Sequence, residues 1–205
     1  MSIPDILQNA RVVPVVVIQD ASNAVPLAQA LVQAGLNIIE VTLRSEQALE
    51  AIRRIASDVP EMNVGAGSVR YSHQIAALQE AGAGFAVSPG SSQSLLDAAN
   101  DAGLPLVPGV ATATEVIALL EQGVMLQKFF PAGILGGVAA LKALGSPLPE
   151  VKFFPTGGIT IENAPEYLGL SNVHCIGGTW VAPEDLISAG DFVAISERAR
   201  TAAQL

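Results

Sequence analysis

Three charged residues stand within or directly after stretches that are typical of buried strands: Lys128, Glu40 and Arg44. Lys128 lies in residues 125–130, a short apolar run that predicts a buried strand. Burial disfavours the charged form of an amine, and an uncharged amine can attack a carbonyl carbon and form a Schiff base. The alternative interpretation is that Lys128 lies at the end of its strand and extends its ammonium group into solvent.

Glu40 lies inside an apolar segment, residues 37–43, where a carboxyl group is uncommon unless it is paired or functional. Alternation along a strand places Ile38, Glu40 and Thr42 on one face. A buried carboxyl group there is suited to general acid–base catalysis. The alternative is an ion pair with Arg44 that only neutralises a buried charge. Arg44 could instead hold a substrate carboxylate with two hydrogen bonds, so the three residues together predict carbonyl chemistry on an anionic substrate.

The elements that would position these residues alternate between strand and helix along the whole chain. This order predicts a parallel sheet, and about eight units without a linker indicate an α/β fold, a single (β/α)8 TIM barrel over residues 1–205 with a short N-terminal helix. An open doubly wound sheet is the alternative, but no Gly-x-Gly-x-x-Gly follows the first strand. The expected strands are residues 12–18, 37–43, 62–69, 84–88, 104–108, 125–130, 151–155 and 172–176. The expected helices are residues 1–10, 22–34, 45–57 with Ser45 as N-cap, 72–81, 91–102, 112–122, 137–144, 161–168 and 183 onward.

Small residues follow nearly every expected strand, at the end where barrel enzymes hold their active sites. Two glycine pairs, Gly157-Gly158 and Gly177-Gly178, come after the last two strands. Many barrels bind phosphate at this position through backbone N–H groups and the positive end of a following helix. The pattern therefore predicts a phosphate site that needs no cationic side chain.

The composition excludes several classes of binding partner. The formal net charge of −9 argues against nucleic acid or an anionic membrane as a partner. The start of the chain lacks the pattern of a signal peptide and the longest apolar run is too short to span a bilayer, so we expect a cytoplasmic protein. The single cysteine, Cys175, excludes an internal disulfide, and the two histidines, His73 and His174, lack neighbours at ligand spacing, so no metal is expected.

Seven motifs, in order along nearly the whole chain, resemble those of the 2-keto-3-deoxy-6-phosphogluconate (KDPG) aldolase family. They are PVVVI near the start, EVTLR at 40–44, GAGSV at 65–69, SPG at 88–90, KFFPA at 128–132, PTGGI at 155–159 and CIGGTW at 175–180.

The resemblance implies a class I aldolase that needs no metal or other cofactor, forms pyruvate and glyceraldehyde 3-phosphate from a small phosphorylated keto acid, and assembles as a homotrimer. Cleavage of 4-hydroxy-2-oxoglutarate to pyruvate and glyoxylate is also implied. Matched motif by motif, Lys128 is the imine-forming lysine and Glu40 the proton-transferring residue. The substrate-binding residues that it implies are Arg44, Thr156, Ser68, Pro89, Phe130, Gly157, Gly158, Gly177, Gly178 and Thr179.

The chain departs from the family pattern at a few positions. Ser68 replaces the usual threonine and Thr179 a serine, and both keep a hydroxyl group; Gly133 replaces a common glutamate and is followed by Ile134 and Leu135. The last change borders the expected site and bears on substrate preference. A related aldolase for another 2-keto-3-deoxy acid, such as the galactonate epimer, and a non-catalytic phosphosugar-binding barrel are the alternatives.

Overall fold

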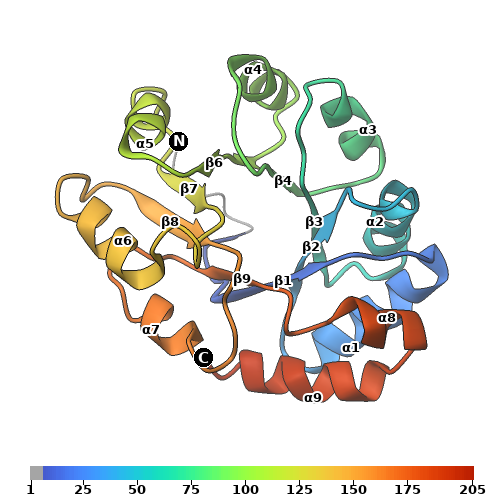
Figure 1. Ribbon diagram of the computed structural model, residues 1–205. Coiled ribbons are helices and arrows are strands. Elements are labelled where there is room, and N and C mark those ends of the chain that lie inside the picture. The colour runs from blue at the N-terminus through green and yellow to red at the C-terminus, as the bar shows by residue number, and fades with distance from the viewer. Residues whose placement is uncertain (1–6) are drawn as a thin grey trace.

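The computed structural model describes residues 7–205, and the fold consists of parallel strands with helices around them (Figure 1). The expected short helix at residues 1–10 falls mainly outside the described residues. Residues 7–10 form a turn in which the Ala10 N–H donates to the Leu7 carbonyl at 3.1 Å.

All strand pairs in the described residues are parallel, and they form two sheets. The larger sheet has the order β5-β4-β3-β2-β1-β9 and the smaller one the order β6-β7-β8. The α/β class with a parallel sheet is therefore confirmed. The strands are β1 (Val12–Val16), β2 (Ile38–Thr42), β3 (Asn63–Gly67), β4 (Phe85–Val87), β5 (Leu106–Val107), β6 (Gly109–Val110), β7 (Leu126–Phe129), β8 (Lys152–Pro155) and β9 (Ile176–Gly178).

The expected strand at residues 104–108 is shorter in the structure, where β5 covers only Leu106–Val107 and ends before Pro108. A further strand, β6, begins directly after Pro108 and belongs to the other sheet. Proline has no N–H to donate to a ladder. The Pro108 carbonyl instead accepts the Lys128 N–H at 2.8 Å, so the chain changes its pairing partner at this residue from β4 to β7.

The expected last strand, residues 172–176, is also displaced. Val173 makes only an isolated bridge to Phe153, and β9 begins at Ile176, where it pairs with β1. The glycines that were expected to follow this strand are part of it, with Gly177 paired with Val13. A second isolated bridge joins Thr156 to Gly177 and brings the end of β8 next to β9.

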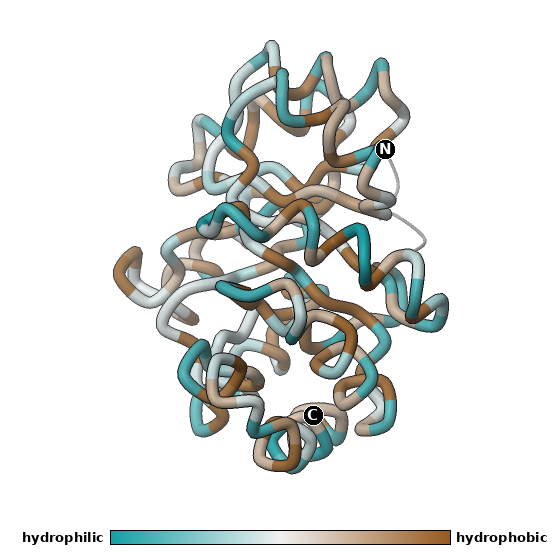
Figure 2. Tube along the Cα trace, turned by 90° about the vertical axis from the view of Figure 1, so that its right-hand side faces the viewer, coloured by the Kyte–Doolittle hydropathy of each residue, from teal (hydrophilic) through white to brown (hydrophobic). Residues whose placement is uncertain are grey.

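The helices lie on the outside of the strands, and along the trace they alternate between hydrophobic and hydrophilic residues (Figure 2). One side of each helix therefore packs on the strands. They are α1 (Ala24–Gln33), preceded by the 3-10 turn η2 (Ala21–Asn23), α2 (Ala48–Asp58), α3 (Gln74–Glu80), α4 (Gln93–Asp101), α5 (Ala113–Leu120), α6 (Gly137–Gly145), α7 (Ala164–Leu168), α8 (Glu184–Ala189) and α9 (Phe192–Ala202).

The expected N-cap at Ser45 is wrong. Helix α2 begins at Ala48, and the residue before it, Gln47, makes no side-chain cap. The Ser45 hydroxyl donates instead to the Ile18 carbonyl at 2.6 Å, which ties the turn after β2 to the end of β1. A serine hydroxyl that donates to a carbonyl group near the end of another strand does not cap a helix. The spacing of residues in the sequence does not show which of these two hydrogen bonds a serine makes.

Alternation along the strands separates two hydrophobic clusters. The larger fills the space between strands and helices and contains Ile39 and Phe129. The smaller lies on the opposite face of the strands and contains Ile38, Leu126 and Phe154. Because side chains two residues apart share a face, Glu40, Lys128 and Thr156 lie on the same face as this smaller cluster, one step closer to the carboxyl ends of β2, β7 and β8. The strands therefore bring three polar residues together above an apolar floor.

Candidate active site

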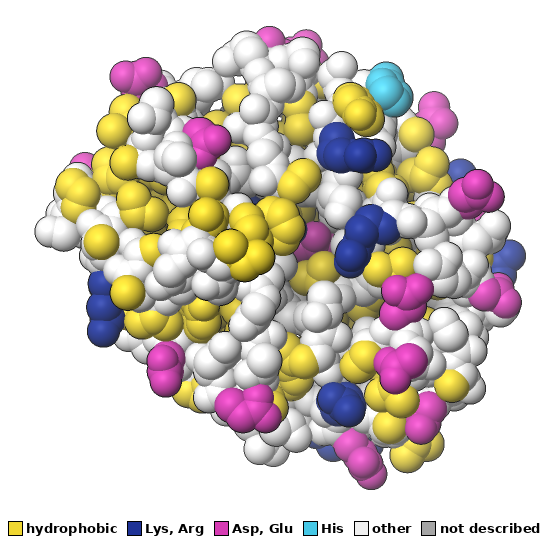
Figure 3. All heavy atoms as spheres, viewed as in Figure 1, with side chains coloured by type: hydrophobic (Ala, Val, Ile, Leu, Met, Phe, Trp, Pro, Cys, Tyr) yellow, Lys and Arg dark blue, Asp and Glu magenta, His cyan; other side chains and the backbone are white. Residues whose placement is uncertain are grey.

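A pocket of about 280 Å³ lies at the carboxyl ends of the strands. Figure 3 views the molecule onto this face and shows a hollow near its middle, with Lys and Arg groups on one side and hydrophobic groups on the other. Eleven of the twelve residues expected at the site line this pocket, and three further residues join them. The lining consists of Val15, Glu40, Thr42, Arg44, Ser68, Pro89, Lys128, Phe130, Thr156, Gly157, Gly158, Ile159, Gly177 and Thr179.

Lys128 and Glu40 form a buried pair inside the pocket. The Lys128 Nζ lies 3.3 Å from Glu40 Oε1, and the residues are 4% and 0% exposed. The Lys128 amine also lies 5.4 Å from the centre of the Phe130 ring. The alternative in which Lys128 extends into solvent is therefore wrong. An amine held beside a carboxylate can pass its proton to that partner and become a nucleophile.

Glycine 67 makes room for the Glu40 side chain. Gly67 is the residue of β3 paired with Thr42, and a Cβ atom at this position would overlap the carboxyl group of Glu40. Glu40 Oε2 accepts no hydrogen bond from the described residues, although it is buried. Buried polar atoms are rarely unpartnered, so a free carboxylate oxygen in a pocket is available to a ligand or to water.

Arg44 lies in the turn after β2 and does not pair with Glu40. Its Nε donates to the Thr42 hydroxyl at 3.1 Å, and the ion pair of Glu40 is with Lys128. The alternative in which Glu40 only neutralises Arg44 is therefore wrong for this structure. The guanidinium is exposed and lines the pocket, where it can meet an anion.

Ser68 has the only positive φ among the non-glycine residues that the structure describes, at 58°. A left-handed backbone costs an L-residue energy, and such outliers gather at functional sites. The conformation follows directly after β3 and places Ser68 on the wall of the pocket with Pro89 and Phe130. The sequence pattern gives no sign of this backbone geometry.

The two glycine pairs come together as expected, with one exception. The bridge between Thr156 and Gly177 aligns the two turns, and Gly157 and Gly158 both have positive φ, at 97° and 76°. Gly177 and Thr179 line the pocket, whereas Gly178 does not, and a Cβ at Gly178 would overlap the indole of Trp180.

The helix that was expected to support a phosphate after β8 is short. It begins at Ala164 instead of residue 161 and has five residues, too few for a strong dipole. Helix α8 carries Glu184 and Asp185 in its first turn, and these repel an anion at its positive end. An anion at the glycine turns would therefore depend on backbone N–H groups and the Thr179 hydroxyl.

The residues that the sequence analysis missed are Val15, Thr42 and Ile159. Thr42 had a usable signal, because it shares the inward face of β2 with Glu40. Val15 had none, because it pairs with Glu40 in the register of β1 and β2, and register is not visible in one sequence.

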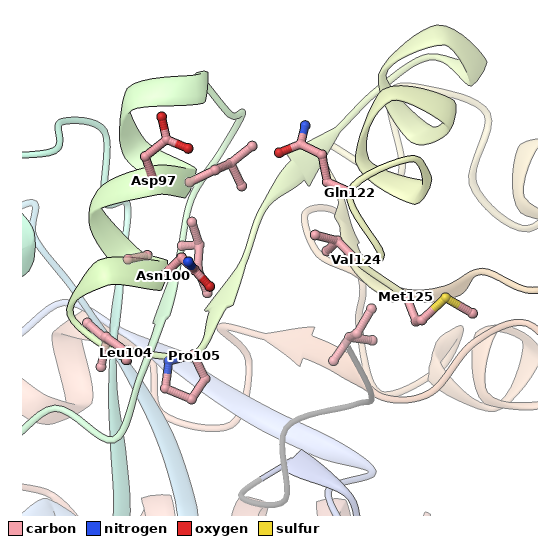
Figure 4. Close-up of a pocket in the computed structure, with 12 residues that line it drawn as sticks. Asp97, Asn100, Leu104, Pro105, Gln122, Val124 and Met125 are labelled. Atoms are coloured by element: carbon pink, nitrogen blue, oxygen red, sulfur yellow. The ribbon is translucent and has the colours of Figure 1, made fainter.

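A second cavity of about 430 Å³ lies at the opposite end of the strands. Side chains of α4 and of the segments that lead into β5 and β7 line it, among them Asp97, Asn100, Gln122 and Met125 (Figure 4). It is larger than the first but its lining contains no lysine, arginine or histidine. Only the smaller pocket therefore combines a buried amine with an acid–base partner.

Within residues 7–205, no group of three His, Cys, Asp or Glu side chains is arranged to hold a metal ion. His174 bonds through its Nε2 to the Leu7 carbonyl at 2.7 Å, and His73 stacks on Tyr71 with ring centres 5.4 Å apart. In the same part of the chain, every helix is too short or too polar to cross a membrane.

The fold and the pocket together define a class of parallel α/β proteins that hold a buried lysine–carboxylate pair at the carboxyl ends of their strands. The family model for KDPG and KHG aldolases matches residues 3–198. The chain belongs to this aldolase family.

Individual relatives agree with this membership. The chain is 48% identical over 202 residues to the 2-dehydro-3-deoxy-phosphogluconate aldolase of Pseudoalteromonas atlantica. The aligned residues cover 98% of this chain and 94% of the relative. The solved KDPG aldolase of Legionella pneumophila, with pyruvate captured at low pH as a covalent carbinolamine intermediate, is similar with a TM-score of 0.92, 41% identity and 95% of each chain covered. The Zymomonas mobilis ZM4 enzyme, solved with 3-phosphoglycerate, gives a TM-score of 0.90 and 44% identity, covering 97% of this chain and 93% of that one.

Proposed function

We propose that the protein is a class I aldolase that cleaves 2-dehydro-3-deoxy-6-phosphogluconate into pyruvate and D-glyceraldehyde 3-phosphate. The observation that carries the proposal is the buried pair of Lys128 Nζ and Glu40 Oε1, 3.3 Å apart in a pocket open to ligands. A non-catalytic phosphosugar-binding protein would have no need to bury these two charges together. Membership of the KDPG and KHG aldolase family supports the same substrate and adds 4-hydroxy-2-oxoglutarate, cleaved to pyruvate and glyoxylate.

In this mechanism Lys128 is the nucleophile and Glu40 moves the protons. The Lys128 amine gives a proton to Glu40 and attacks the C2 carbonyl carbon, which forms a carbinolamine. Glu40 returns this proton to the carbinolamine hydroxyl, which leaves as water, so that a protonated imine and an ionised Glu40 remain. Glu40 then takes the proton of the C4 hydroxyl, the C3–C4 bond breaks, and its electron pair passes into the imine to give an enamine and the aldehyde. Return of the proton to C3 and hydrolysis of the imine release pyruvate and restore the amine.

The remaining lining residues bind the two ends of the substrate. We infer that Arg44 and Thr156 hold the carboxylate next to the imine carbon, with Ser68 contributing its hydroxyl, while Pro89 and Phe130 pack against the carbon chain. The phosphate would lie at the glycine turns, held by Gly157, Gly158, Gly177 and Thr179. Gly178 is left out of this set because it does not line the pocket.

We further propose that the two sheets close into one eight-unit barrel that makes residues 1–205 a single domain. The change of partner at Pro108 and the bridge between Thr156 and Gly177 support this closure, because they join the sheets at both edges. Assembly as a homotrimer in the cytoplasm completes the proposal. Light scattering of the purified protein would test the assembly, since its 21.0 kDa chain gives a trimer of three times that mass.

The proposal is tested by measuring pyruvate release from KDPG with a coupled lactate dehydrogenase assay. We expect cleavage by the wild type and loss of about 10³-fold or more with Lys128→Ala, because the nucleophile is removed. Lys142→Ala is the matched control, since Lys142 is exposed in the last turn of α6, and it should keep wild-type activity. Absence of cleavage by the wild type, or equal loss in both variants, would contradict the proposal. The C4-epimeric galactonate substrate, assayed in parallel, tests the related specificity.

A further inference from the structure

Thr42 lies between Arg44 and the neighbouring strand, and its hydroxyl contacts both. Thr42 is the last residue of β2 and is 2% exposed. Its hydroxyl donates to the Val16 carbonyl of β1 at 2.9 Å and accepts the Arg44 Nε at 3.1 Å. One buried side chain therefore connects the strand to the guanidinium.

The direction of these bonds is fixed by the chemistry of a hydroxyl group. A threonine hydroxyl has one hydrogen to donate and lone pairs that accept. A carbonyl oxygen can only accept, so the hydroxyl hydrogen goes to Val16 and a lone pair faces Arg44. The same oxygen is thereby available as an acceptor for Nε, and the four remaining N–H groups of the guanidinium have no acceptor among residues 7–205, so they can bind a ligand.

Arg44 has few other restraints. It is exposed, it lies in a turn, and within residues 7–205 it makes no ion pair. An arginine side chain with several rotatable bonds loses conformational freedom when it grips a ligand. The hydrogen bond from Nε to the Thr42 hydroxyl restricts the Arg44 side chain before a ligand binds. Less conformational entropy is then lost on binding, so the affinity for the ligand is higher.

We propose that Thr42 is the positioning residue that orients Arg44, so that the guanidinium meets the substrate carboxylate through its Nη groups. The inference rests on the proposed function, in which Arg44 binds that carboxylate. It assigns to Thr42 an action through Arg44, with no role in the bond-making steps.

The test uses the full-length protein and pyruvate as the probe. The pyruvate concentration that gives half-maximal borohydride trapping is measured by intact-protein mass spectrometry. Thr42→Val keeps the shape of the side chain but removes the acceptor, and we expect the half-maximal concentration to rise about 10-fold. Thr42→Ser keeps the hydroxyl, and its half-maximal pyruvate concentration should lie within about 2-fold of the wild-type value.

A double-mutant cycle separates positioning from a general loss of structure. Arg44→Ala removes the group that Thr42 orients. The half-maximal pyruvate concentration of the double variant, Thr42→Val with Arg44→Ala, should therefore differ from that of Arg44→Ala alone by no more than about 2-fold. A matched control is Ser45→Ala. Ser45 lies in the same turn as Arg44, but its hydroxyl bonds to the Ile18 carbonyl at the end of β1. This variant should therefore behave as the wild type.

Three results would overturn the inference: no effect of Thr42→Val, an equal effect of Thr42→Val with and without Arg44, or an effect of Ser45→Ala as large as that of Thr42→Val. If the wild type forms no adduct at all, the proposed function fails and the inference fails with it. If the wild type is trapped and Thr42→Val is trapped equally well, the inference alone fails.

Discussion

Glu40 Oε1 lies 3.3 Å from Lys128 Nζ, and the other carboxylate oxygen of Glu40 has no hydrogen-bond partner in residues 7–205. One oxygen thus faces the amine that we propose as the nucleophile, while the other is buried without a partner in the described residues. In the proposed mechanism, this single carboxyl group exchanges protons with the amine and with the substrate. Removal of either partner of such a buried pair leaves an uncompensated charge, so the two residues depend on each other.

Glu40→Gln tests the proton-transfer role. Glutamine has nearly the same shape but cannot accept or release the proton, and general acid–base groups contribute about 10²–10⁴-fold to rate. We expect kcat for KDPG cleavage to fall in that range. Glu46→Gln is the matched control, because Glu46 is an exposed carboxylate in the turn after the same strand. A Glu40→Gln variant with wild-type kcat would show that another group moves the proton.

Ser68→Gly separates the backbone conformation of Ser68 from its hydroxyl. Glycine adopts the φ of 58° without strain, but it also gives the unfolded chain more freedom. We expect the free energy of unfolding to stay equal or rise by up to about 1 kcal/mol, measured by urea denaturation. The half-maximal pyruvate concentration should rise, because the hydroxyl is lost.

Ser68→Ala is the control for this prediction. It removes the hydroxyl but keeps the positive φ, so it should show the weaker pyruvate binding without any gain in stability. If Ser68→Gly binds pyruvate as tightly as the wild type, the hydroxyl makes no contribution to binding. If it is clearly less stable than Ser68→Ala, the backbone at residue 68 is not strained.

Cys175 makes the stability of the fold depend on pH in the alkaline range. Its side chain is fully buried in the smaller of the two hydrophobic clusters. This burial, with a smaller contribution from the charge of Glu40, raises the pKa of the Cys175 thiol. The unfolded thiol ionises above its ordinary pKa of about 8.5 while the folded one stays protonated. The stabilisation is therefore complete below that pH and is lost as the pH rises above it, by about 1.4 kcal/mol per pH unit.

The measurement compares urea denaturation of the wild type and Cys175→Ala between pH 8 and pH 11. Other groups titrate in both proteins, so the difference between them isolates the thiol. We expect the wild type to lose stability more steeply than Cys175→Ala. Parallel curves would contradict the prediction, as would rapid labelling of Cys175 by a thiol reagent in the native protein.

Much of the fold could be predicted from the sequence because the strands are short apolar runs and glycines follow most of the helices. Strand β2 and helix α1 were found to within a few residues for this reason. The predictions at Pro108 and Ser45 are wrong because the roles of these residues depend on neighbours that are distant in the sequence. The Pro108 carbonyl pairs with β7, and the Ser45 hydroxyl bonds to the end of β1.

The sequence predicts most of the residues that line the candidate site, but it does not predict the contacts between them. Lys128 and Glu40 stood out because a charged residue in an apolar run is unusual, and the motifs supplied most of the remaining residues. The contact between them joins β2 and β7, and one sequence does not reveal which strands face each other. The link from Thr42 to Arg44 was likewise invisible, because it depends on where the Thr42 hydroxyl donates its hydrogen.

The Schiff-base mechanism is tested most directly by trapping the imine. The protein is incubated with pyruvate and reduced with borohydride, and the modified peptide is located by mass spectrometry. The chain has three lysines, of which Lys142 and Lys152 lie outside the pocket. We predict a single adduct on Lys128 that is absent from Lys128→Ala. No adduct, or an adduct on Lys142 or Lys152, would contradict the Schiff-base mechanism.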